Sequence, residues 1–387
     1  MQLIVLEEKK WWAAAIEIEN RITDIWAEQI DMGKPGHGDL ILGKVSAVLD
    51  GKNAAFVSLG RGKPGLLNGD ELVVSQRQKT VGKSKPAVSD CLEEGQPVLV
   101  QVKYPGADRK GPILTELITF TGEKLVYMPY AGYSGVSKQL TAKRERLLSF
   151  AEQRCIEQEG LIFRTSSGQA NDVQLNRELE THRAEFNRLL EMSTGMLPPA
   201  LLKKGKGLSE QVSNLFPLHH VTGFISNSPD ALTAFMPYLP KQVEVSLPPH
   251  HQKKTGKLKE TLASLQQQTV KIAKANLHIE ETKAVTAIDV DSGGADFGSK
   301  RETHYAVNIA AIDEIARQIR LRNIGGMIVI DFLRVEREDQ AILFELMKSK
   351  ETNDPRLQVV GFTKLGLFEL QRKKAGLPLS KITRNDE

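Results

Sequence analysis

The chain has 387 residues, 40% of them hydrophobic and 26% charged, which is the length of about two or three folded domains. This composition excludes a chain that is mainly disordered. Lysine and arginine number 52 against 48 acidic residues, so the net charge of +4 is too small to indicate nucleic-acid binding by itself.

The chain has only two cysteines, Cys91 and Cys155. They form neither a disulfide framework nor a zinc site, and a reducing compartment is expected. The N-terminus lacks the basic start and apolar run of a secretory signal, and no run of 18 apolar residues occurs. We therefore expect a cytoplasmic protein without a membrane span.

The first third of the chain has the pattern of short strands. Residues 1–30 predict two strands and a turn. From about residue 38 to 120, short apolar runs alternate with glycine-rich turns and show no helical period, which predicts a small antiparallel barrel of the OB type. The polar, basic stretch 75–89 is expected to be a loop.

Helical spacing follows at residues 141–159 and from residue 172 onward. The stretch 198–217, rich in proline, glycine and lysine, is expected to be a linker. The last third alternates helices and strands, which predicts an α/β unit with neighbouring strands at 284–290 and 327–330.

Two carboxylates stand at the ends of these last two strands. Asp289 ends the first and Asp331 follows the second, and open α/β sheets place ligands at such strand ends. A pair of carboxylates suits Mg²⁺, which can polarise a phosphodiester and activate water. The alternative is that each aspartate only caps a strand end or a turn.

Longer segments around these aspartates resemble a known family. Residues 286–293 and 307–332 closely resemble the catalytic segment of the ribonuclease E/G family. Residues 53–57 and 110–115 resemble its OB-fold RNA-binding module. The family's 5′-sensor is resembled by residues 125–129, 135–137 and 163–165. Its closing strand is resembled by residues 363–370. The resemblance covers nearly the whole chain in the family's order.

The resemblance implies a multidomain fold of α/β and β parts. An RNase H-like part, interrupted by an OB-fold RNA-binding barrel and a 5′-sensor, would be followed by a DNase I-like α/β catalytic part. The expected boundaries are 1–36 and 215–280 for the RNase H-like part, 37–120 for the barrel, 121–214 for the sensor and a helical linker, and 281–387 for the catalytic part.

The resemblance also implies an endoribonuclease that uses Mg²⁺, or Mn²⁺, to cleave single-stranded RNA in rRNA maturation or mRNA decay. In this interpretation Asp289 and Asp331 hold the metal. Asp291 is assigned to catalysis as well, although the family usually has Asn there, and Arg334 stands near a position that tends to be acidic. These departures allow an alternative, an RNA-binding or rRNA-maturation factor with weak or lost catalysis.

By the same resemblance, a 5′-sensor that favours monophosphorylated RNA is expected. Arg164 and Thr165 would grip the terminal phosphate, and Gly122 and Val126 would line the pocket. Lys138 stands where the family tends to place Arg, and a lysine keeps the charge without the guanidinium fork, which predicts a weaker preference. The alternative for Arg164 is a surface residue at a strand end.

In the barrel, Phe56 is the candidate platform for base stacking, with Lys103 and Lys110 along the phosphates. The alternative is that Phe56 belongs to the barrel core. Leu66 occupies the position of a second aromatic residue in the family, so one stacking surface is expected to be missing.

Two further expectations concern partners. Larger family members continue into a Cys-x-x-Cys segment that joins subunits through zinc; this chain has none, so no structural zinc is expected and the oligomeric state stays open between a monomer and a dimer without zinc. A lysine cluster before the strand of Asp289 is expected to lie where an RNA backbone could run: Lys253, Lys254, Lys257, Lys259, Lys271 and Lys274.

Overall fold

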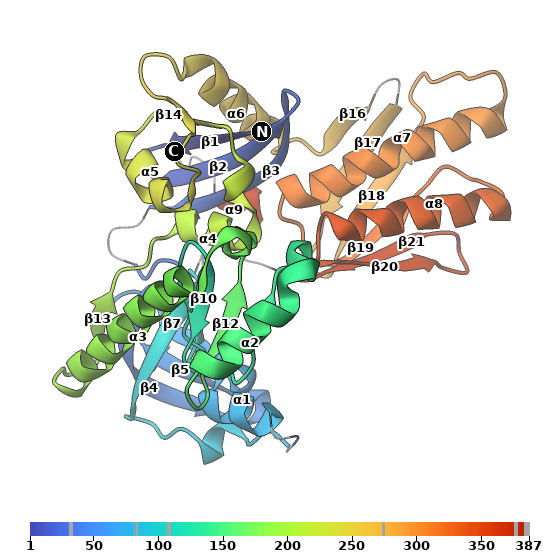
Figure 1. The fold of residues 1–387 in the computed structure, drawn as a ribbon. Helices are drawn as coiled ribbons and strands as arrows, with labels where there is room; N and C mark the ends of the chain where they lie inside the picture. The colour runs from blue at the N-terminus through green and yellow to red at the C-terminus, as the bar shows by residue number, and fades with distance from the viewer. Residues whose placement is uncertain are drawn as a thin grey trace. The chain divides into compact units, whose positions relative to one another are not determined.

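The computed structural model describes residues 1–30, 34–80, 82, 84–106, 110–272, 275–374 and 378–382. Its contacts divide the chain into two compact units (Figure 1). The first unit comprises Met1–Ile30, Thr222–Ala231 and Val243–Glu387, and the second comprises Asp31–Val221 and Leu232–Gln242. The first unit is therefore built from both ends of the chain.

One sheet of the first unit has the order β15-β14-β1-β2-β3. Its strands are β1 (Gln2–Glu7), β2 (Trp11–Ile18), β3 (Arg21–Gln29), β14 (Gly223–Ser226) and β15 (Glu244–Ser246). We expected two strands before residue 30 and the structure has three, because Glu19 and Asn20 take left-handed backbone conformations in a tight turn that returns the chain as β3. The helix α6 (Gln252–Ser264) packs on β1.

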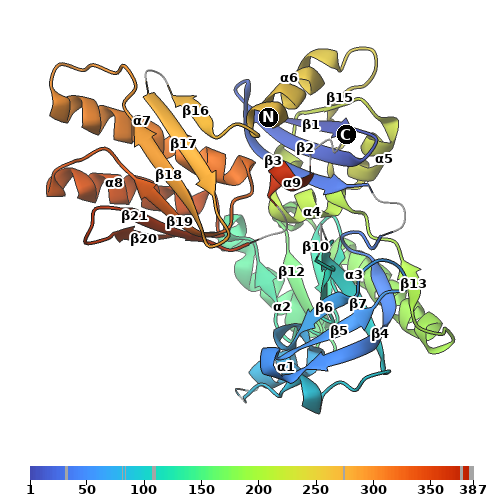
Figure 2. The same cartoon turned by 180° about the vertical axis from the view of Figure 1, so that it is seen from behind.

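The second sheet of this unit has the order β16-β17-β18-β19-β21-β20. Its strands are β16 (Thr269–Ile272), β17 (Ala275–Glu281), β18 (Val285–Asp291), β19 (Gly326–Asp331), β20 (Leu357–Phe362) and β21 (Phe368–Arg372). The helices α7 (Lys300–Leu321) and α8 (Arg337–Ser349) lie on one face, and Figure 2 shows the strands from the other face. The α/β prediction for this segment is confirmed.

Helix α7 also contacts the first sheet. Its side chains bond to β3: the Arg317 Nε donates to the Ile22 carbonyl oxygen at 2.7 Å, and the Arg320 Nε lies 3.2 Å from the Asp24 carboxylate. Glu314 on the same helix forms an ion pair with Arg21. The two sheets of the first unit are thereby joined through one helix. A short helix, α9 (Leu379–Ile382), also packs on β3.

In the second unit, five strands close into a barrel, which confirms the prediction of an OB-like barrel. They are β4 (Leu40–Leu49), β5 (Ala54–Ser58), β6 (Gly65–Asn68), β8 (Ile113–Thr115) and β7 (Pro97–Tyr104), and the pairing of β7 with β4 closes the ring. The expected loop at 75–89 is wrong at its start, where α1 (Val73–Thr80) forms. Most of its residues are polar, but Ser75 is buried, as is Leu72 just before the helix, so tertiary contacts support a helix that the sequence pattern does not indicate.

A four-stranded sheet follows the barrel, in the order β11-β12-β10-β9. Its strands are β9 (Phe120–Thr121), β10 (Leu125–Met128), β11 (Gly135–Val136) and β12 (Gly160–Phe163), and it packs with α2 (Arg144–Arg154) and α3 (Asp172–Thr194) around one core. The expected linker at 198–217 instead contains β13 (Ala200–Lys203), which pairs with β4, and α4 (Leu208–Leu215). The last helix of the chain's middle part is α5 (Pro229–Phe235).

The lysine cluster before β18 serves the fold more than we expected. Lys254 and Lys257 both pair with Glu17 of β2, whose side chain is only 2% exposed, and Lys259 pairs with Glu8. Lys254 and Lys257 thus compensate a buried carboxylate of the first sheet, whereas Lys259 pairs with a partly exposed one. Contact of these lysines with an RNA backbone stays a prediction. Lys274 lies outside the described residues.

The Glu17 ion pairs lead to a prediction about stability. Burial raises the pKa of Glu17, but the hydrogen bonds from Lys254 and Lys257 outweigh it and hold the pKa below its usual range. Replacing Glu17 with Gln should therefore destabilise the protein by about 3 kcal/mol at neutral pH, the cost of breaking a buried ion pair. Thermal unfolding should show a melting temperature several degrees lower.

The pH dependence of this effect follows from the sign of the shift. A carboxylate with a depressed pKa stabilises the fold above its unfolded-state pKa of about 4.3. The difference between wild type and Glu17→Gln should thus be present at pH 6 and shrink below about pH 4. As a control, Glu8→Gln should cost less than about 1 kcal/mol because its pair is exposed. Equal melting temperatures of wild type and Glu17→Gln at pH 6 would contradict this account.

Candidate functional site

The parallel pairing of β18 and β19 places two of the predicted site residues side by side. Asp289 and Asp331 are direct partners in the register of this pair. Ile288 and Ile330 beside them are buried under the helices, whereas both aspartates are exposed on the opposite face. Alternation along each strand therefore directs both carboxylates to the face of the sheet away from α7 and α8. Figure 2 shows the strands from this open face.

This pair continues as a polar row across four strands. His278 on β17 is opposite Asp289, and Thr269 on β16 is opposite His278. The Thr269 hydroxyl lies 3.1 Å from the His278 Nδ1. His278 was not identified from the sequence, although the alternation of β17 between buried and exposed residues is a signal that could have placed it on this face.

Asp291 lies two residues after Asp289 on the same face, beside Asn276. Its Oδ1 accepts a hydrogen bond from the Gly293 backbone N–H at 3.0 Å, and its Oδ2 from the Asn276 amide at 3.4 Å. The Gly293 N–H and then the Asn276 amide lower the pKa of Asp291. The residue is therefore held as a carboxylate by the turn that follows β18, and its catalytic role stays a prediction.

A buried amide fixes the chain just after Asp331. Asn308 on α7 is fully buried; its Nδ2 donates to the Leu333 carbonyl oxygen at 2.7 Å, and its Oδ1 accepts from the Leu333 N–H at 3.0 Å. One helical turn earlier, the His304 Nδ1 lies 2.9 Å from the Arg334 carbonyl oxygen. Helix α7 thus holds the segment that leaves the strand end, a role for Asn308 that its position at the start of the resembling block did not reveal.

The carboxylates of Asp289 and Asp331 can provide oxygen ligands to a cation. In the part of the chain that the structure describes, no three or more His, Cys, Asp and Glu side chains form a group that could hold a metal ion. Two carboxylates that leave the remaining positions to water fit Mg²⁺, which retains several waters and prefers oxygen. The donor set therefore fits a hard divalent cation better than zinc.

The predicted sensor residues lie at one edge of the four-stranded sheet. β11 and β12 run parallel and end at this edge, where Ser137 and Arg164 follow them, while β10 is antiparallel to β12 and begins there. The backbone bonds Arg164 N–H to Lys124 O, at 2.8 Å, and Ser137 N–H to Phe163 O, at 2.9 Å, hold the strand ends together. The edge therefore brings together the predicted residues Gly122, Val126, Lys138, Arg164 and Thr165.

The Arg164 guanidinium is already hydrogen-bonded within the protein. It donates to the Gly122 carbonyl oxygen at 3.0 Å and to the Ser213 carbonyl oxygen at 2.5 Å. Burial lowers its pKa. Arg164 is therefore not the simple surface residue of the alternative, since it ties β9 to α4; its contact with a phosphate stays a prediction.

The other sensor residues differ in how closely neighbouring groups contact them. The Thr165 hydroxyl lies 3.0 Å from the Ser137 hydroxyl, and Lys138 is exposed. Gly122 lies so close to α3 that a Cβ there would meet the Glu178 Oε1 at 2.0 Å. Lys138 is thus the residue of this group that can be changed without disturbing the packing.

On the barrel, Phe56 points outward. Its neighbours Ala55 and Val57 are fully buried in the barrel core, while Phe56 is half-buried on the other face of β5. The alternative that Phe56 belongs to the core is therefore wrong. Leu66 and Ile113 are its successive partners across β6 and β8, and we call Phe56, Leu66 and Ile113 the outer stripe.

The two predicted lysines of the barrel are not equivalent. The Lys103 ammonium forms an ion pair with Glu71, so its charge is already compensated. Lys110 is exposed. Contacts of either lysine with phosphate stay predictions, and Lys110 needs no rearrangement to make one.

Comparisons with known proteins agree with the resemblance described above. The model of the Ribonuclease E/G family matches residues 119–375. Ribonuclease G of Escherichia coli (strain K12) is 28% identical over 373 residues, which cover 90% of this chain and 75% of the relative. Ribonuclease E of Nostoc sp. is 30% identical over 391 residues, covering 97% and 56%, and that of Synechocystis sp. is 28% identical over 399 residues, covering 98% and 58%.

The length and the apolar character of the helices bear on the expectation about a membrane span. None of the helices in the described residues is both long and apolar enough to cross a bilayer.

The Asn308 contacts give a prediction for this region. Asn308→Ala should leave the partly buried N–H and C=O of Leu333 unpaired, at a cost of about 1 kcal/mol for each group. The Leu333 amide should then exchange its hydrogen at least tenfold faster, as measured by hydrogen exchange on the peptide that spans residues 327–336. His304→Ala, which removes one partly exposed bond, should have a smaller effect; unchanged exchange in Asn308→Ala would refute the proposed support.

Proposed function

This chain belongs to the ribonuclease E/G family of endoribonucleases, and from this premise we propose that it cleaves single-stranded RNA at a divalent metal held by Asp289 and Asp331. The observation that carries the proposal is the direct pairing of these two residues on the open face of the sheet. We further propose that Mg²⁺ is the metal, and that the two sheets of the first unit are its RNase H-like and DNase I-like parts.

The side chains around the pair have separate tasks in this proposal. A bound Mg²⁺ would supply polarisation of the scissile phosphoryl oxygen and a lower pKa of an attacking water. Asp289 and Asp331 hold the ion, and Asn308 keeps the end of β19 in place through Leu333. Asp291, already bound to the turn at Gly293, orients that turn toward the RNA.

The barrel and the four-stranded sheet hold the RNA. Bases stack on Phe56, whose ring lies on the outer face of β5, and Lys110 contacts the backbone. Leu66 supplies apolar area without an aromatic face, so the platform is narrower than two aromatic rings would make it. A terminal 5′-monophosphate binds at the edge that carries Thr165 and Lys138, with Arg164 fixing the shape of that edge.

A test of the metal assignment uses two conservative variants. Asp289→Asn and Asp331→Asn each remove a ligand charge, so cleavage of a 5′-monophosphorylated single-stranded RNA in Mg²⁺ should fall by more than about a hundredfold. RNA affinity measured by fluorescence anisotropy in EDTA should change less than twofold. Asp313→Asn, at an exposed carboxylate on α7 that pairs with Lys350, is the matched control and should cleave normally.

Two results would contradict the proposal. Full activity in either aspartate variant would remove these residues from the site. Wild-type protein that binds the RNA in a salt-sensitive manner but gives no products that depend on Mg²⁺ would instead favour the alternative function, an RNA-binding factor without catalysis.

The proposed sensor is tested by restoring the guanidinium at residue 138. Lys138→Arg should raise the ratio of cleavage rates on RNAs with a 5′-monophosphate and a 5′-hydroxyl severalfold, because arginine can donate two parallel hydrogen bonds to phosphate. Initial rates on two RNAs of identical sequence measure the ratio. Lys52→Arg, on an exposed turn of the barrel, is the control; a ratio that is unchanged in Lys138→Arg would count against a phosphate at this edge.

A further inference from the structure

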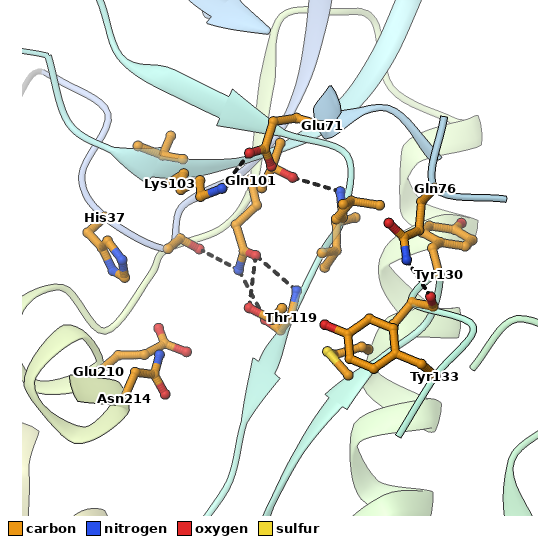
Figure 3. A pocket seen from close by; sticks show the side chains of 17 residues that line it. His37, Glu71, Gln76, Gln101, Lys103, Thr119, Tyr130, Tyr133, Glu210 and Asn214 are labelled. Carbon is orange, nitrogen blue, oxygen red and sulfur yellow. Dashed lines mark hydrogen bonds and ion pairs between the residues drawn. The ribbon is translucent and has the colours of Figure 1, made fainter. Parts of the chain in front are cut away.

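A cavity of about 260 Å³ lies within the second unit, between the barrel and the four-stranded sheet (Figure 3). It is far larger than the ~30 Å³ that one water occupies and lies near the lower limit for small-molecule sites. Residues of β7, of the segment after β10 and of α4 line it. Among the residues that line it are Gln101, Lys103, Tyr130, Tyr133, Glu210 and Asn214.

The charges around this cavity disfavour a phosphate. Lys103 is the one lysine or arginine among the described lining residues, and its ammonium is paired with Glu71. Glu210 on α4 is 9% exposed, and burial raises its pKa. Burial also lowers the pKa of His37 to about 4, so this imidazole is neutral at neutral pH. A neutral ligand is therefore favoured over an anion.

The walls combine aromatic rings with hydrogen-bonding groups. The ring of Tyr130 packs edge-on against Phe186, with centroids 5.5 Å apart, and this contact fixes its orientation. Tyr133 is 56% exposed and stands at the side of the cavity away from Glu210 and Asn214 (Figure 3). Flat faces with carboxyl and amide groups opposite them are the combination by which proteins hold an unstacked base.

The floor of the cavity is rigid. The Gln101 Nε2 donates to the Thr119 carbonyl oxygen at 3.1 Å, and its Oε1 accepts from the Thr119 N–H at 2.9 Å. The amide is thereby satisfied within the protein and joins the barrel to the chain that leads into the four-stranded sheet. The cavity is therefore preformed, which reduces the entropic cost of filling it.

The cavity also continues the outer stripe of the barrel. Ile113, the last residue of the stripe, and Thr115, which lines the cavity, lie on the same face of β8. Residues two apart on a strand are separated by about 7 Å, which is comparable to the spacing of successive nucleotides in an extended strand. An RNA whose base stacks on Phe56 can thus present a nearby base to the cavity.

We propose that this cavity receives one unstacked nucleobase of the bound RNA, held between the Tyr133 ring and the polar groups of Glu210 and Asn214. The inference rests on the proposed function, since it requires that the barrel binds single-stranded RNA. It adds to that function a position in the substrate where the base itself contributes to affinity.

The test is an abasic scan of a short single-stranded RNA, measured by fluorescence anisotropy in EDTA with Asp289→Asn so that no cleavage occurs. Each nucleotide in turn is replaced by an abasic residue. One position should weaken binding about tenfold, the effect expected for loss of a stacked base. With Tyr133→Ala added, the same position should become nearly insensitive, while Tyr133→Phe, which keeps the ring, should retain the sensitivity.

Ile156→Ala, a 56% exposed side chain in the same unit, is the matched control and should leave the scan unchanged. RNA that binds with equal sensitivity to every abasic position in wild type and Tyr133→Ala would overturn the base site and leave the proposed function standing. RNA that fails to bind at all would overturn both.

Discussion

The parallel pairing of β18 with β19 is the constraint on which the rest of the first unit depends. Parallel neighbours need a crossover, and α7 is that crossover. Because the helix must cover the sheet, its inner side is apolar; because it must also hold the strand end, it carries Asn308. The same helix bonds to β3 through Arg317 and Arg320, so one element positions the carboxylates and joins the two sheets.

Burial of acidic side chains, rather than position in the sequence, determines which lysines are already paired within the protein. The lysines before β18 form a conspicuous basic run, yet Lys254 and Lys257 compensate a carboxylate that is almost fully buried. Lys103 likewise compensates Glu71. Lys110 and Lys138 are exposed. The basic surface that can attract a polyanion is consequently smaller than the composition indicates. A buried carboxylate that is distant in the sequence pairs with some of the lysines.

Much of the architecture could be predicted because local patterns carry it. The alternation in β18 and β19 and the helical period between them predict an α/β unit with Asp289 and Asp331 at adjacent strand ends, and glycine-rich turns predict the barrel. The sequence did not predict α1 or β13, whose short polar segments are supported by tertiary contacts. It also could not show that Arg164 is bound to backbone carbonyls or that Phe56 faces outward, since both depend on partners distant in the chain.

The discontinuity of the first unit has a consequence for how the chain acquires its structure. The strand β1 pairs with β14, which is made only after the whole stretch Asp31–Val221. During synthesis on the ribosome, the barrel and the four-stranded sheet can form from segments that are close in the sequence. The strands β1 to β3 can pair with one another, but β1 keeps an unpaired edge until β14 is made. Closing so long an interval costs chain entropy that local pairing does not. The second unit is therefore the part that can fold during synthesis, and the first unit is completed last.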